Sequence, residues 1–137
     1  MENALLSNAA ATARACLRGA EDDSMSFPQA VGALAAAGIE SYAIDFRRAT
    51  ATYYLPDGRS IQLDTHRLDT PIAVAFDDAP VKAAIREAQN LAPGYSYRGF
   101  CRKVAAAGCA GYMVSFAGRR AVYFGRDGAT HVERFPD

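Results

Sequence analysis

Apolar residues recur every three or four positions in four stretches of the chain, which is the spacing of an amphipathic helix. These stretches cover residues 5–17, 27–34, 81–88 and 97–107. A glycine closely follows three of them, and a glycine in the left-handed conformation is a common helix stop. The pattern therefore predicts four helices arranged in two pairs.

After each pair of predicted helices the apolar period changes to two, which is typical of strands with one buried face. Each half then offers three short runs of this kind, separated by turn-forming residues. Asp57-Gly58 and Asp127-Gly128 are predicted to form two-residue hairpin turns of the primed type, which require positive φ. The predicted strands cover 42–46, 51–55 and 60–63 in the first half, and 112–116, 121–124 and 130–134 in the second.

Helix starts are marked at two places. Ser26 is a predicted N-cap with Gln29 at the reciprocal position of a capping box, and Pro28 fits the first helical turn. Asp78 is the predicted cap of the third helix, with Pro80 in its first turn.

The chain matches itself when it is shifted by 70 positions without a gap. Eleven of the 38 positions from 26 to 63 are identical to those from 96 to 133, among them Tyr42 with Tyr112 and Tyr53 with Tyr123. The alternative explanation is chance in an alanine-rich chain. The aromatic, glycine and Asp-Gly matches in one register favour duplication of a supersecondary unit.

We therefore predict an α+β fold, in which an α-α-β-β-β unit occurs twice and antiparallel hairpins pack on helices. The 137 residues form one domain with two pseudo-repeats, about 1–63 and 79–134, joined by a linker over 64–78. Within that linker, the apolar run 72–76 is either an extra strand or a docked extended segment.

Composition excludes several classes of protein. Half of the residues are apolar, and 15 basic residues balance 15 acidic ones. Bulk disorder, and binding to nucleic acid or membrane surfaces driven by net charge, are therefore disfavoured. No run approaches the roughly 20 apolar residues of a membrane span, and the first residues lack a signal-peptide pattern, so we expect a cytoplasmic protein.

Three cysteines, Cys16, Cys101 and Cys109, are too widely spaced for a zinc finger and too few for a disulfide framework. We interpret them as free structural thiols of a reducing compartment. No metal or cofactor motif is found, and no known nucleic-acid-binding signature.

The candidate catalytic residues are His131, Glu133 and Tyr112. Positions 131 and 133 share one face of a strand, so the carboxylate can orient the imidazole for acid–base chemistry. The simpler alternative is a half-exposed pair at a sheet edge. His66, in the linker, is interpreted as a surface loop residue.

Positive charge gathers in the last part of the chain. Residues 98–137 hold seven basic and three acidic residues, so this part has a net charge of +4 and residues 1–97 have −4. Arg119, Arg120 and Arg126, near turns, are candidates for contact with an anionic ligand or an acidic partner. Solvated arginines are the simpler alternative, and a homodimer that joins opposite charges stays open.

Several residues resemble a small bacterial family of unknown function, whose members are YbcV-like and are sometimes labelled phage envelope proteins. The resemblance rests on the run 124–128, on His131-Val132-Glu133, on Phe135-Pro136, on Phe27-Pro28, and on Gly38 with Tyr42, and it spans about 25–136. It implies a fold shared with those proteins and no catalytic residues.

Taken together, these patterns favour a small bacterial binding or interaction module. The alternative is a small enzyme with a site at the seam between the repeats, using His131, Glu133 and a tyrosine. A phage-derived accessory protein is a third reading, which depends on the family label.

Overall fold

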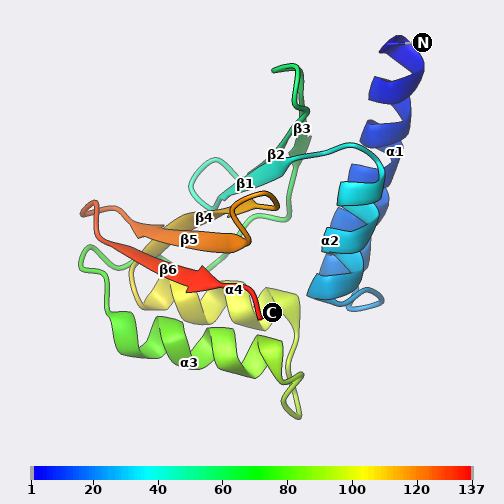
Figure 1. The fold of residues 1–137 in the computed structure, drawn as a ribbon. Coiled ribbons are helices and arrows are strands. Elements are labelled where there is room, and N and C mark those ends of the chain that lie inside the picture. Colours follow the sequence, from blue (N-terminus) through cyan, green and yellow to red (C-terminus); the bar gives the residue numbers. More distant parts are fainter. Residues whose placement is uncertain (1, 137) are drawn as a thin grey trace.

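The computed structural model describes residues 2–136, which form four helices and six strands (Figure 1). Their order confirms the predicted pattern of two helices and three strands, repeated once. The helices are α1 (Glu2–Glu21), α2 (Phe27–Ala36), α3 (Asp78–Gln89) and α4 (Tyr97–Ala106). The strands are β1 (Ser41–Asp45), β2 (Thr50–Tyr54), β3 (Ser60–Asp64), β4 (Cys109–Ser115), β5 (Arg120–Gly125) and β6 (Thr130–Arg134).

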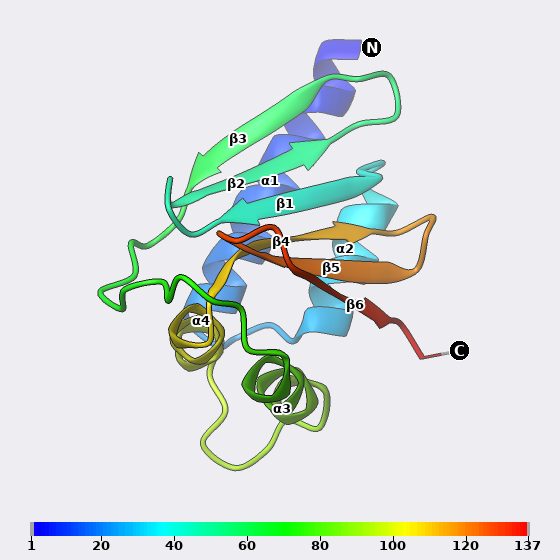
Figure 2. The ribbon, with the colours of Figure 1, turned by 90° about the vertical axis from the view of Figure 1, so that its left-hand side faces the viewer.

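The six strands form one antiparallel sheet in the order β3-β2-β1-β4-β5-β6. The two halves therefore join through the central pair β1 and β4 (Figure 2). In this pair Ala43 lies opposite Met113, the residue 70 positions later. Equivalent strands of the two halves, such as β1 and β4, therefore run in opposite directions. The Ala43–Met113 pair lies where the two halves of the sheet meet.

Helices cover only one face of the sheet. Alternate strand residues such as Tyr42, Ile44 and Val114 are buried in the same core as Leu34 of α2 and Val104 of α4. The residues between them point to the other side, which we call the outer face. Met113 and Val132 on that face are 36% and 44% exposed, so no part of the described chain covers them. The α+β class predicted from the periodicity is confirmed.

The local signals at the helix starts are realised in part. Ser26 accepts a hydrogen bond from the backbone of Gln29, and the Gln29 side chain accepts one from the backbone of Ser26, as a capping box requires. The prediction for α3 was wrong by one residue. Asp77 is the N-cap and makes no side-chain capping bond, while Asp78 lies inside the helix and pairs with Lys82.

The predicted hairpin turns are also corrected. Gly58 has φ of 92° and Gly128 has φ of 84°, but neither preceding aspartate has positive φ. Leu55 and Arg59 close the first loop by a backbone hydrogen bond, and Gly58 bonds back to Leu55. The loop therefore has three residues and ends on a left-handed glycine, which is a different hairpin class from the two-residue primed turn.

Residues 65–77 contain no strand, so the apolar run at 72–76 is a docked extended segment. The backbone of Ala73 donates to Ala105, and Asp77 donates to Ala107. These bonds fix the segment along the end of α4.

Elements of the two halves correspond at a spacing of 70 residues. The bounds of α2 and α4 differ by this number, as do those of β3 and β6. Positive φ recurs at the same spacing, at Gly38 with Gly108 and at Ala49 with Arg119. This correspondence agrees with a tandem duplication. Superposition of the two repeats, and the boundaries 1–63 and 79–134, stay predictions.

Candidate functional site

Three segments far apart in the sequence meet at one seam of the molecule: the end of α1, the start of α4 and the chain leaving β3. α1 ends at Glu21, and the chain then reverses through Asp23, which has φ of 60°. The Asp23 carboxylate accepts a hydrogen bond of 3.0 Å from the backbone of Tyr97, the first residue of α4. The seam therefore joins the first half of the fold to the second.

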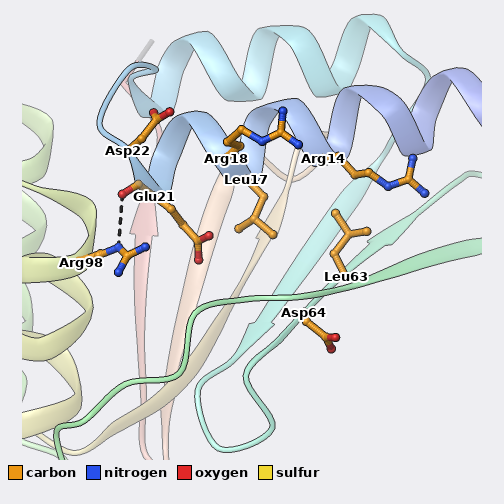
Figure 3. A pocket seen from close by; sticks show the side chains of 8 residues that line it. All are labelled: Arg14, Leu17, Arg18, Glu21, Asp22, Leu63, Asp64 and Arg98. Carbon is orange, nitrogen blue, oxygen red and sulfur yellow. Dashed lines mark hydrogen bonds between the residues drawn. The ribbon is translucent and has the colours of Figure 1, made fainter.

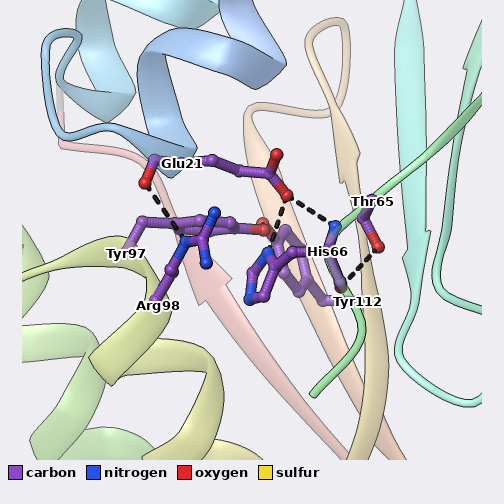
Figure 4. Close-up of polar contacts among 6 residues, drawn as sticks. All are labelled: Glu21, Thr65, His66, Tyr97, Arg98 and Tyr112. Atoms are coloured by element: carbon purple, nitrogen blue, oxygen red, sulfur yellow. Dashed lines mark hydrogen bonds and ion pairs between the residues drawn. The ribbon is translucent and has the colours of Figure 1, made fainter.

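Glu21 and His66 form a pair in this seam (Figure 4). One carboxylate oxygen of Glu21 lies 2.7 Å from His66 Nδ1 and accepts a hydrogen bond of 2.8 Å from the His66 backbone. Their side chains are only 19% and 17% exposed. His66 is therefore not the surface loop residue that the sequence indicated, because the carboxylate of α1 holds it against the fold.

The second ring nitrogen of His66 is buried and has no hydrogen-bond partner among the described residues. Since an imidazole nitrogen is a donor or an acceptor in either tautomer, burying it without a partner costs free energy. A carboxylate on Nδ1 favours the tautomer with the proton on that nitrogen, which leaves Nε2 as an acceptor.

Arg98 and two tyrosines surround this pair (Figure 4). Arg98 Nε donates to the Glu21 carbonyl at 3.3 Å, and thereby satisfies a backbone acceptor at the end of α1. The hydroxyls of Tyr97 and Tyr112 lie 2.8 Å apart. Burial raises the pKa of both phenols well above the usual range, so both stay neutral at ordinary pH.

A cavity of about 420 Å³ opens beside the Glu21–His66 pair (Figure 3). Arg14 and Arg18 reach it from successive turns of α1, and Arg98 reaches it from α4. Leu63 points toward α1, whereas Asp64 turns away from it. The complete lining is Arg14, Leu17, Arg18, Glu21, Asp22, Leu63, Asp64 and Arg98.

Three acidic side chains line this cavity, and two of them, Glu21 and Asp22, have partners among the described residues. Glu21 binds His66, and Asp22 accepts a hydrogen bond of 2.9 Å from the Ser24 backbone. The hydrogen bonds from Ser24, together with the nearby charge of Arg18, lower the pKa of the Asp22 carboxyl. Within the described chain neither Arg14 nor Arg18 forms an ion pair, so these two guanidinium groups have no carboxylate partner there.

His131 and Glu133 contact each other as the sequence predicted, with 3.0 Å between Nε2 and the carboxylate. The other ring nitrogen lies 3.5 Å from Asp78. Tyr112 is not beside them, since it is separated from His131 by Tyr123 on β5. The structure therefore joins two of the three candidate catalytic residues, and carboxylates face both nitrogens of the histidine.

Arg119, Arg120 and Arg126 do not form one patch. Arg119 and Arg120 lie at the start of β5, where Arg119 donates to the Pro136 carbonyl. Arg126 follows the other end of β5 and donates to the Ile72 carbonyl. Six residues of strand, about 3.3 Å each, separate the two positions, so a small anion does not contact all three.

Cys16, Cys101 and Cys109 are buried and unpaired, which confirms the interpretation as structural thiols. Burial raises the pKa of Cys101 to about 12 and that of Cys109 to about 11. Thiols of this kind are poor nucleophiles at neutral pH.

The residues that the sequence missed are Glu21, His66 and Arg98, with Arg14 and Arg18. Their counterparts at a spacing of 70 are Leu91, Pro136 and Pro28, with Ala84 and Ala88. Residues that match at a spacing of 70 belong mainly to the shared core, and these five have no polar match. Polar residues without a polar counterpart in the other half are therefore the signal that points to them.

A family model described as a protein of unknown function, DUF1398, matches residues 20–133. The chain belongs to this family. The match covers most of the chain and includes Glu21, His66 and Arg98, whereas Arg14 and Arg18 precede it. A comparison with curated proteins gave no match.

Two further observations concern the described residues, 2–136. No helix there is long and apolar enough to cross a bilayer. No group of three or more His, Cys, Asp or Glu side chains is placed there to hold a metal ion.

Proposed function

We propose that this DUF1398 protein is a binding module for a small organic anion, which it holds in the seam cavity through Arg14, Arg18 and Arg98. The observation that carries this proposal is that three arginines from two helices line one cavity. Guanidinium groups bind carboxylate and phosphate through paired hydrogen bonds. The neighbouring Glu21 carboxylate is engaged by His66, so it competes little for the arginines.

The size and lining of the cavity indicate the class of ligand. Its volume of about 420 Å³ is within the range of sites for small molecules. Leu17 and Leu63 give it an apolar wall beside the charged groups. A molecule with a carboxylate or phosphate at one end and an apolar body fits this combination better than an inorganic ion.

Thermal unfolding with added anions tests the proposal. Inorganic phosphate, a nucleoside monophosphate and an aliphatic dicarboxylate are compared at equal ionic strength with chloride. At one hundred times its Kd a ligand adds about 2.7 kcal/mol to the free energy of unfolding, which raises Tm by several degrees. We expect such a rise for at least one organic anion, and its loss in Arg18→Gln.

The matched control is Arg86→Gln, which removes the same charge from the exposed part of α3, away from the cavity. The control variant should respond to the anions as the wild type does. A Tm that no organic anion raises, or an equal rise in Arg18→Gln, would contradict the proposal.

The second candidate function is an enzyme with its site at the same seam, and one observation supports it. Nε2 of His66 is a buried acceptor without a donor, and a carboxylate orients the ring from the other side. Such a pair resembles the arrangement in which a carboxylate positions a histidine that acts as a base. His66 fits this role better than His131, whose two nitrogens both face carboxylates.

A nitrogen-15 NMR titration of the His66 ring separates these two functions. If a bound anion donates a hydrogen bond to Nε2, the resonance of that nitrogen shifts on ligand addition and the base role gains support. If the Arg18-dependent anion binds without moving this resonance, the site binds its ligand and the histidine is structural.

A further inference from the structure

A second feature lies on the opposite side of the molecule from the core: the outer face of the sheet has no cover. Its central row runs across the strands through register partners, with Ala43 opposite Met113, Met113 opposite Val122, and Val122 opposite Val132. Met113 and Val132 are the most open of these apolar side chains, and Tyr54, at the end of β2 on the same face, is 40% exposed. Contiguous apolar groups of this kind on a soluble protein mark an interaction surface.

Charge on the outer face is divided between the two halves. The outward positions of β1, β2 and β3 include Asp45 and Asp64 and no basic residue. Those of β4, β5 and β6 include Arg120 and Arg134 and no acidic residue. Within residues 2–136 none of these four side chains forms an ion pair.

The two arginines lie directly opposite each other on β5 and β6. Like charges in that position destabilise a sheet, and nothing in the described chain compensates them. The acidic groups lie on the other half of the same face, and Asp64 occupies the corner diagonal to Arg134.

We propose that the outer face binds the outer face of a second copy of this chain, and so forms a symmetric dimer. A two-fold axis that lies between the two sheets, parallel to them and perpendicular to the line from Asp64 to Arg134, places the Asp64 corner of each copy over the Arg134 corner of the other. Each contact then occurs twice, as a symmetric interface requires. The apolar row meets its own counterpart in the middle, and charge fixes the relative orientation.

The area of the outer face indicates how tightly the two copies bind each other. Six strands about 4.8 Å apart and five residues long at about 3.3 Å each give a footprint of about 500 Å² per copy. Both copies together then bury about 1,000 Å², which is near the lower limit of specific interfaces. The dimer is therefore weak and concentration-dependent, and salt weakens it because its charges lie at the rim.

Sedimentation equilibrium of the full chain over a range of concentrations and salt tests this proposal. The wild type should associate to a dimer at high protein concentration and low salt. Arg134→Glu should raise the dissociation constant of the dimer by roughly tenfold or more, because the reversed charge occurs twice in a symmetric interface. Asp64→Lys should weaken the dimer in the same way, and the double variant should restore it.

Two further variants complete the experiment. Arg102→Glu makes the same change of net charge on exposed α4, away from the outer face, and should leave dimerisation nearly unchanged. Met113→Glu should abolish the dimer through the apolar row, and circular dichroism confirms that each variant is folded. A wild type that stays monomeric at all concentrations would overturn the proposal. A dimer that Arg134→Glu and Met113→Glu do not weaken would overturn it as well.

Discussion

At the scale of single residues, the ionisable side chains in the buried core are tyrosines and cysteines, which are uncharged at ordinary pH. Seven tyrosine and cysteine side chains of the described residues belong to the buried core, among them Tyr42, Tyr112 and Cys101. Burial raises the pKa of each of these three groups. Their hydroxyls and thiols therefore act as neutral packing groups, and the fold gains no stability from ionising them.

This burial predicts that alkali destabilises the protein. The thiols of Cys101 and Cys109 have an ordinary pKa of 9.0, and the fold raises it to about 12 and about 11. Above about pH 9 the unfolded chain loses these protons while the folded one keeps them, so the free energy of unfolding falls by at most about 1.4 kcal/mol per thiol and pH unit.

Urea unfolding at about pH 8 and about pH 10 measures this effect. Cys101→Ala should lose less stability over that range than the wild type, because one of the buried thiols is gone. A free energy of unfolding that stays constant up to about pH 10 would contradict the assignment.

At the scale of helices and strands, two equivalent glycines have different surroundings. Gly38 and Gly108 both follow a helix, with φ of 89° and 95°. Open space lies where a Cβ on Gly38 would point, whereas a Cβ on Gly108 would collide with the backbone of Ala75. The docked segment 65–77 is the cause of this difference, since it passes over the end of α4.

The pair predicts unequal costs for the same substitution. Gly38→Ala places a side chain in the left-handed region and should lower the free energy of unfolding by about 1 to 2 kcal/mol. Gly108→Ala adds overpacking against Ala75 and should cost about 2 to 4 kcal/mol. Equal midpoints in urea unfolding of the two variants would show that the segment does not dock there.

Helices and strands could be predicted because their signals are local. The capping residues at Ser26 and the change from helical to strand period place each element within a few residues. The bond between Glu21 and His66 could not be predicted, because it joins residues 45 positions apart through the fold. The turn at Asp57-Gly58 was predicted wrongly, since the dipeptide suits both two-residue and three-residue loops.

At the scale of the whole molecule, the pairing of Ala43 with Met113 makes a prediction about symmetry. An experimental structure should superpose residues 26–63 on 96–133 with equivalent residues 70 apart. The register of the strands must match in both halves, because a slip by one residue would turn every buried side chain of a strand to the outer face. A different strand order or a shifted register in either half would refute the duplication.

The central pairing of β1 with β4 also bears on how the protein is made. When a ribosome has released β1, β2 and β3, the edge of β1 has no partner until the chain reaches β4, which ends at Ser115. At roughly 5–20 residues per second, that interval lasts seconds. During it, the open edge can pair with the same edge of another nascent chain, and Ser41–Asp45 carries one charge to oppose this. Slow translation between codons 65 and 110 should therefore favour aggregation, whereas rapid synthesis of that stretch protects the yield of folded protein.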